Sequence, residues 1–166
     1  MFKNLVFDFD GTIVDSGETV YRGIVGTLNI KAPPFEEIRK YPVHKLIANL
    51  EISKLEMPRL IFRARAEYKK YLPTLMLIDG MSETLHKLQR EGARLFLCTS
   101  NSSENVNHFL KLHKLDSTFE KVMGTLSLFG KSHGIKKTLK NFKLAPHETI
   151  YIGDETRDIE ASKKAN

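Results

Sequence analysis

Short apolar segments that end at a polar residue alternate along this chain with segments whose apolar residues recur every three or four positions. The short segments are typical of strands buried on both faces, and the longer ones are typical of amphipathic helices. We expect strands at Leu5–Phe9, Arg94–Cys98, Phe119–Thr125 and Thr149–Ile152. Strands and helices in alternation predict an α/β fold, a doubly wound parallel sheet of the Rossmann-like type with helices on both faces.

One long stretch, residues 15–78, breaks this alternation. Val20, Ile24 and Leu28 recur at helical spacing, and a second helical stripe includes Ala64 and Tyr68. Strand patterns are nearly absent from it. We therefore expect residues 1–14 and 79–166 to form the α/β core domain and residues 15–78 to form a helical domain inserted after the first strand.

Composition excludes several classes of protein. The chain has 166 residues, 41% of them apolar, which suits a soluble domain with an inserted subdomain. The single cysteine, Cys98, rules out an internal disulfide and a cysteine-rich zinc site, and its apolar strand favours a buried thiol over a nucleophile. No segment approaches the roughly 18 apolar residues of a membrane span, and no signal peptide is evident. We predict a cytoplasmic protein with no membrane partner.

Basic residues exceed acidic ones, 26 to 20, which gives a formal charge of +6. This excess is compatible with an anionic partner. The basic residues are scattered and lack the interleaved aromatic residues that stack bases, so the pattern favours a solvated surface over a nucleic-acid site.

Polar side chains follow the predicted strands where each one ends. They are Asp8 and Asp10, then Thr99 and Ser100, then Asp154 and Asp158, with Lys131 after the third strand. Parallel strands present their carboxyl ends at one edge of the sheet, so these residues should meet there. Clustered carboxylates repel one another unless a cation neutralises them, and all-oxygen ligands favour Mg²⁺ over Zn²⁺.

These motifs, in this order, resemble the four motifs of the haloacid dehalogenase (HAD) superfamily. They are Asp8-Phe9-Asp10-Gly11-Thr12, Thr99, the lysine of Gly130-Lys131, and Gly153-Asp154-Glu155-Thr156-Arg157-Asp158. The size and helical character of residues 15–78 resemble the C1-type cap of the phosphoglycolate-phosphatase-like branch. The resemblance implies a HAD core and a hydrolase acting on phosphoric monoesters.

The resemblance also implies a role for each matching residue. Asp8 would attack phosphorus and form an aspartyl-phosphate. Asp10 would protonate the leaving oxygen, activate water, and reach the metal through its backbone carbonyl. The presence of an acid at this position favours phosphate esters over the dehalogenase reaction.

The remaining matching residues would bind phosphate or metal. Thr99 and Lys131 would contact the phosphoryl oxygens, helped by backbone N–H groups of Ser100 and of Phe9 or Gly11. Asp154 would complete a Mg²⁺ site with Asp8 and Asp10. Asp158 would either bind the metal or orient Lys131 and a metal-bound water.

Several alternatives stay open at this level. Thr99 could cap the following helix, although Ser102 could do so instead. Gly130-Lys131-Ser132 also suggests a P-loop, but Gly124 stands one residue too far upstream for that motif. The sequence gives no role to Asn101, Glu155 or Arg157.

Two other functions compete with a phosphatase that acts on a small phosphorylated metabolite. One is a phosphoglucomutase-like phosphoryl transferase, which would share the same motifs. The other is a non-catalytic HAD-fold binding protein. The chain also stops within the helix that begins near Asp158, so we expect the C-terminal part of the core to be missing and a strand edge to be exposed.

Overall fold

The structure is a computed structural model, and it describes residues 2–29, 33–38, 56–125 and 131–165. The chain divides into two compact units. One contains Met1–Asp15 and Leu75–Asn166, and the other contains Ser16–Thr74. Since the chain leaves the first unit after Asp15 and returns at Leu75, the second unit is an insertion in the sequence of the first.

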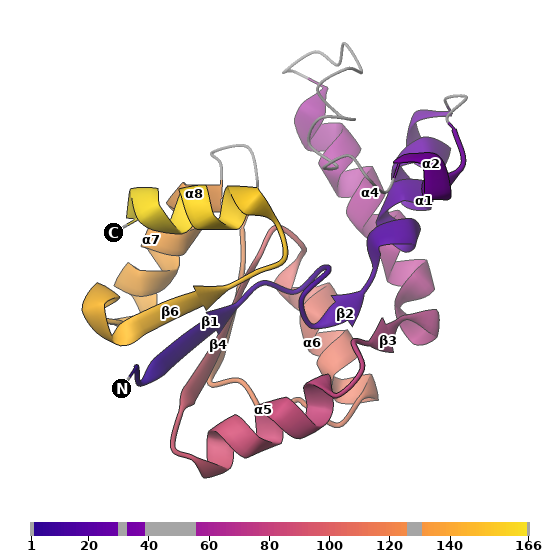
Figure 1. The fold of residues 1–166 in the computed structure, drawn as a ribbon. Coiled ribbons are helices and arrows are strands. Elements are labelled where there is room, and N and C mark those ends of the chain that lie inside the picture. The colour runs from indigo at the N-terminus through magenta and orange to yellow at the C-terminus, as the bar shows by residue number, and fades with distance from the viewer. Residues whose placement is uncertain (1, 30–32, 39–55, 126–130, 166) are drawn as a thin grey trace. The chain divides into compact units, whose positions relative to one another are not determined.

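A parallel sheet forms the centre of the first unit (Figure 1). Its order is β5-β4-β1-β6, made of β1 (Asn4–Phe7), β4 (Arg94–Thr99), β5 (Lys121–Gly124) and β6 (Thr149–Ile152). In the register, Phe7 lies opposite Leu97 on one side and Ile152 on the other. The carboxyl ends of β1, β4 and β6 therefore come to the same edge.

Helices cover both faces of this sheet, with α7 and α8 on one side and α5 and α6 on the other (Figure 1). Their bounds are α5 (Met81–Arg90), α6 (Ser103–Leu112), α7 (Lys131–Phe142), the 3-10 helix η3 (Pro146–Glu148) and α8 (Thr156–Ala165). The predicted doubly wound α/β fold is confirmed.

The core is apolar on both faces of the central strands because neighbouring residues in a strand point to opposite sides. Val6, Phe96 and Cys98 pack in one cluster with Ile135 and other residues of α7 and α8. The alternate residues of the same two strands, which point to the opposite face of the sheet, are also buried: Leu5, Phe7, Leu95 and Leu97. Because these strands are buried on both faces, their sequences are continuous apolar segments.

A short antiparallel ribbon stands where the sequence predicted only helix. Strand β2 (Val14–Asp15) pairs with β3 (Met76–Leu77), with Asp15 opposite Met76. Asp15, Met76 and Leu77 lie in the stretch 15–78 that was expected to be helical, so that expectation is wrong at both ends of the stretch. Two residues are too few to show an alternating pattern, and pairing between chain segments this far apart is invisible in a local window.

The inserted unit is helical in its described part. It contains α1 (Gly17–Leu28), α2 (Phe35–Ile38), α4 (Met57–Tyr71) and the 3-10 helix η1 (Leu72–Thr74). Pro58 lies in the first turn of α4, where its missing N–H costs no hydrogen bond. Helices α1 and α4 make the principal contact within this unit.

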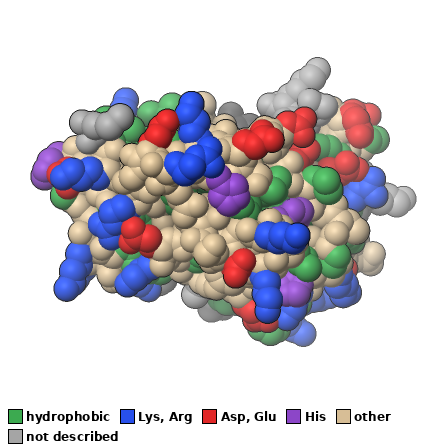
Figure 2. All heavy atoms as spheres, turned by 90° about the horizontal axis from the view of Figure 1, so that it is seen from below, with side chains coloured by type: hydrophobic (Ala, Val, Ile, Leu, Met, Phe, Trp, Pro, Cys, Tyr) green, Lys and Arg blue, Asp and Glu red, His purple; other side chains and the backbone are tan. Residues whose placement is uncertain are grey.

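No described helix combines the length and the apolar composition that crossing a membrane requires. On the face shown in Figure 2, basic and acidic side chains are interspersed and histidines lie among them. This face therefore does not gather the continuous positive charge that a nucleic-acid backbone would require.

Candidate active site

Asp8 occupies the centre of the site, one residue beyond the end of β1. Its backbone N–H donates to the carbonyl of Ile152 at 2.8 Å, so the residue continues the pairing of β1 with β6. Its carboxyl is nearly buried and accepts hydrogen bonds from the Phe9 N–H at 2.8 Å and from Lys131 at 2.5 Å. Asp8 is therefore held at the edge of the sheet by the backbone and by both of its own oxygens.

Burial raises the pKa of Asp8 to about 6, against an ordinary value of 3.8. Lys131 and the Phe9 N–H oppose this rise because they stabilise the carboxylate, while the negative charge of Asp10 adds to it. At neutral pH the group is still ionised for the most part. It is a desolvated carboxylate, which is the state that a nucleophile needs.

Three carboxylates meet at this point. Asp8, Asp154 and Asp158 each offer an oxygen, and these oxygens lie within 4.8 Å of one another. Asp8 and Asp158 are buried, whereas Asp154 is exposed. The donor set is all oxygen and carries up to three negative charges, so it suits a hard divalent cation such as Mg²⁺.

Two glycines permit this convergence. A Cβ on Gly11 would run into the carboxylate of Asp154, and a Cβ on Gly153 would run into the carboxylate of Asp158. Gly11 also has a φ of +76°, a conformation that side chains with a Cβ disfavour. The acidic residues can approach one another only because the intervening chain carries no side chain there.

Lys131 supplies the positive charge of the site from the first residue of α7. Its ammonium forms ion pairs with Asp8 and with Asp158, so it bridges two of the three carboxylates. Burial alone would lower the pKa of Lys131, but the two carboxylates more than compensate and keep it raised. The ammonium also lies 5.8 Å from the centre of the Tyr151 ring. Gly130, which precedes it in the predicted motif, is outside the described residues.

Asp158 is tied to its own loop as well as to Lys131. Its second oxygen accepts the Glu155 N–H at 3.0 Å, at the start of α8. Glu155 in turn accepts from Arg157 at 2.7 Å. The ion pair with Lys131 supports the predicted alternative in which Asp158 orients this lysine. Asp158 also belongs to the carboxylate cluster, so the alternative in which it binds the metal stays a prediction.

Thr12 ends the motif that begins at Asp8, and the sequence alone gave it no role. Its hydroxyl donates to Asp154 at 3.1 Å across a separation of 142 residues. The Thr12 side chain is buried, and its N–H donates to the Phe9 carbonyl. Thr12 therefore links the turn after β1 to the exposed carboxylate after β6. A hydroxyl-bearing residue next to Gly11 was the only hint in the sequence.

Thr99 ends β4 and is almost fully buried. Its hydroxyl oxygen accepts the Asn101 N–H at 3.0 Å, and its carbonyl accepts the Thr125 N–H at 2.8 Å. The helix α6 is capped by Ser102, whose hydroxyl accepts the Asn105 N–H at 3.1 Å. Ser102 therefore provides the cap of α6, while the Thr99 hydroxyl oxygen accepts an N–H within the turn and leaves its own hydrogen available to a different acceptor.

The backbone N–H groups that were predicted to bind phosphate have different hydrogen-bond acceptors in the structure. The Gly11 N–H donates to the Val14 carbonyl at 2.9 Å and so belongs to the turn. The Phe9 N–H donates to the Asp8 carboxylate at 2.8 Å. Both N–H groups therefore already have an acceptor, and the choice between Phe9 and Gly11 stays a prediction. Ser100 is exposed next to the buried Thr99.

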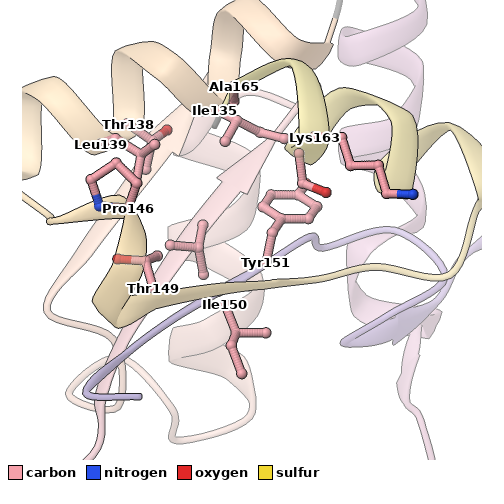
Figure 3. A pocket seen from close by; sticks show the side chains of 11 residues that line it. Ile135, Thr138, Leu139, Pro146, Thr149, Ile150, Tyr151, Lys163 and Ala165 are labelled. Carbon is pink, nitrogen blue, oxygen red and sulfur yellow. The ribbon is translucent and has the colours of Figure 1, made fainter. Parts of the chain in front are cut away.

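A separate hollow of about 360 Å³ lies beside β6, between α7 and α8 (Figure 3). Its lining includes Ile135, Leu139, Tyr151 and Ala165, and none of the predicted catalytic or metal-binding residues contributes to it. Tyr151 also donates its hydroxyl to the Cys98 carbonyl at 3.2 Å. The hollow is therefore lined by other residues than the acidic site, although Tyr151 in its lining also contacts Lys131.

A buried carboxylate, a lysine paired with it and a cluster of carboxylates that could hold a cation thus meet at one edge of a parallel α/β sheet, an arrangement typical of an enzyme active site. The sequence matches the family of haloacid dehalogenase-like hydrolases over residues 5–166. The chain belongs to that family, and the predicted membership is confirmed.

Individual relatives agree with this assignment. The phosphoglycolate phosphatase of Synechococcus elongatus is 29% identical over 170 residues, covering 96% of this chain and 78% of that protein. The pyrophosphatase PpaX of Listeria innocua is 27% identical over 174 residues, covering 97% of this chain and 78% of that protein. The expected phosphoglycolate-phosphatase-like branch and the expected hydrolase are confirmed by this similarity.

A solved structure of a predicted phosphatase from Clostridium acetobutylicum shows the same fold. It superposes with a TM-score of 0.83 at 22% identity, covering 100% of this chain and 82% of that chain. At this level of identity the likeness concerns the fold. It supports the α/β core independently of the motifs.

Proposed function

We propose that this protein is a Mg²⁺-dependent phosphatase that hydrolyses a small phosphorylated metabolite through a phosphorylated Asp8. The observation that carries the proposal is the convergence of a desolvated Asp8, the ammonium of Lys131 and the carboxylates of Asp154 and Asp158. The relatives whose names refer to phosphoglycolate and pyrophosphate lend support, because both substrates are small phosphorylated compounds.

The proposed reaction has two displacements at phosphorus. In the first, an Asp8 oxygen forms a bond to phosphorus while the bond to the ester oxygen breaks, and Asp10 gives that oxygen its proton. In the second, Asp10 takes a proton from water, the water oxygen bonds to phosphorus, and the bond to Asp8 breaks. A carboxylate nucleophile divides one difficult displacement into two easier ones.

Lys131 and Thr99 serve the transferred group in this scheme. The Lys131 ammonium lies beside Asp8 and would offset the charge on the phosphoryl oxygens. The Thr99 hydroxyl hydrogen and the Ser100 and Phe9 N–H groups would donate to those oxygens.

Asp8, Asp154 and Asp158, with the backbone carbonyl of Asp10, would hold the magnesium ion. When bound, Mg²⁺ supplies positive charge that offsets carboxylate repulsion and stabilises the negatively charged phosphoryl group.

The helical unit Ser16–Thr74 is proposed to act as a cap that selects the substrate. It is inserted directly after β2, only a few residues beyond Asp8 and Asp10. This position in the chain supports the role because the turn that carries the catalytic acids leads straight into the insertion.

The test is phosphate release from a panel of phosphorylated metabolites and from p-nitrophenyl phosphate, with Mg²⁺ or EDTA. The Asp8→Asn variant should lower turnover at least about 1,000-fold, since nucleophile removal has large effects. Asp116→Asn, at an exposed position, is the matched control. Acid-quenched protein should carry phosphate that hydroxylamine removes from the wild type and that Asp8→Asn lacks.

Other outcomes would favour the competing functions. Interconversion of hexose phosphates without net phosphate release would support the phosphoglucomutase-like alternative. Folded protein that binds Mg²⁺ but releases no phosphate from any compound would refute the phosphatase proposal.

A further inference from the structure

Asn101, to which the sequence gave no role, lies buried in the turn between β4 and α6. Its N–H donates to the Thr99 hydroxyl oxygen at 3.0 Å. On the other side, a Cβ on Gly124 of β5 would lie 2.8 Å from the Asn101 carbonyl oxygen and 2.6 Å from the Ser103 nitrogen. The turn is thus packed tightly against the sheet, and the backbone of Asn101 has little freedom.

The orientation of the Asn101 amide is also fixed. Its oxygen accepts the Ser102 N–H at 2.8 Å and the side-chain N–H of Asn105 at 3.1 Å. An amide NH₂ group cannot accept these hydrogen bonds, so the oxygen must face α6 and the nitrogen must face away from it. Asn105 is itself buried, which keeps water from replacing this contact.

The amide nitrogen of Asn101 faces Asp10. Its Nδ2 donates to Asp10 Oδ2 across 3.5 Å, the long end of hydrogen-bond distances. The two residues are 91 positions apart in the sequence. Since the amide nitrogen can only donate, Oδ2 of Asp10 serves as the acceptor in this contact.

We propose that Asn101 is a positioning residue for Asp10: it holds Oδ2 and thereby presents Oδ1 to the leaving oxygen of the substrate. The proposal rests on the proposed phosphatase function, in which Asp10 is the general acid. Asn101 itself touches no reacting atom. Its contribution lies in restricting the carboxyl group of Asp10 to one orientation, and general acid catalysis depends strongly on such positioning.

A positioning role for the acid has a specific kinetic signature. p-Nitrophenolate leaves without a proton, whereas the alkoxide of an alkyl phosphate needs one. A variant that misplaces Asp10 should therefore lose phosphorylation rate, measured by kcat/KM, mainly on alkyl phosphates. Damage to the turn alone should affect both classes of ester equally.

The experiment compares Asn101→Ala and Asn101→Asp on p-nitrophenyl phosphate and on the alkyl phosphate that the wild type hydrolyses fastest. Asn101→Asp keeps the oxygen that faces α6 and replaces the donor to Asp10 by an acceptor, so it preserves the shape of the turn. We expect both variants to lower kcat/KM at least about 30-fold on the alkyl ester and less than about 3-fold on p-nitrophenyl phosphate.

Ser102→Ala is the matched control. It removes the side-chain cap of α6 but leaves the Ser102 N–H, which holds the Asn101 oxygen. Its ratio of kcat/KM on the two esters should equal that of the wild type.

Equal losses on both esters in a folded Asn101 variant would overturn the assignment. In that case an active wild type and an inactive Asp8→Asn would leave the phosphatase function standing. A wild type that hydrolyses neither ester would refute the proposed function and this assignment together.

Discussion

Replacing Asp8 by asparagine should stabilise the metal-free protein at neutral pH. Burial raises the pKa of Asp8 to about 6 from 3.8. The carboxyl is only 7% exposed, so solvent screens little of this effect. A difference of about two pKa units corresponds to about 3 kcal/mol, the free-energy cost of keeping the group ionised in the folded state. Asparagine is neutral and avoids this cost.

The sign of the pH dependence follows from the raised pKa. Well below its ordinary pKa of 3.8 the carboxyl is neutral in both the folded and the unfolded state, and the penalty is absent. As the pH rises from about 4 through 6, the unfolded chain ionises first and the folded protein loses stability relative to it. The stability gap between Asp8→Asn and wild type should grow from near zero well below pH 3.8 to about 3 kcal/mol above pH 7.

The assay is urea unfolding followed by circular dichroism at pH 4.5 and 7.5, in EDTA and in millimolar Mg²⁺. Mg²⁺ should reduce the gap at pH 7.5, because the ionised Asp8 gains a cation partner that asparagine binds poorly. Asp116→Asn, at an exposed position, should show no comparable pH-dependent gap. A gap of equal size at both pH values, or a destabilised Asp8→Asn at pH 7.5, would refute the reasoning.

Two further perturbations test the surroundings of the site. Burial raises the pKa of Cys98 to about 11. Its thiol should therefore resist alkylation at pH 8 in the native protein and react after denaturation. Rapid alkylation of the native protein would contradict this burial. Gly11→Ala and Gly80→Ala place alanine at nearly the same φ, +76° and +75°, and each should cost about 1 kcal/mol in urea unfolding. Of the two added Cβ atoms, only the one at residue 11 meets Asp154, so only Gly11→Ala should also weaken the stabilisation of the protein by Mg²⁺. Equal effects of Mg²⁺ on the stability of the two variants would argue against that clash.

The sequence predicted the positions of all four core strands, but only some of their bounds. The strands predicted at Leu5–Phe9 and Phe119–Thr125 are Asn4–Phe7 and Lys121–Gly124 in the structure. The strand predicted at Thr149–Ile152 has those same bounds in the structure, and the one at Arg94–Cys98 is longer by a single residue. The ribbon of β2 and β3 was missed because each strand has only two residues, and its pairing joins segments on either side of a long insertion.

In the site, too, some residues could be predicted from the local sequence and others could not. Asp8 and Asp154 could be predicted because each follows a strand, and parallel strands end at one edge. Thr12 and Asn101 could not, since their roles depend on partners 142 and 91 positions away. Both are common polar residues in turns, where a local explanation is always available.

The α/β core, the edge at which the polar residues gather and the acidic, all-oxygen character of the site could all be predicted from the sequence. These follow from local periodicity and from the residue types at strand ends, which need no knowledge of distant contacts. Two features became visible in the folded structure alone: Lys131 bridges Asp8 and Asp158, and the Asn101 amide turns its nitrogen toward Asp10. Those contacts depend on the close packing of turns from separate strands, and hydrogen-bond direction is set by partners that become neighbours only when the sheet has formed.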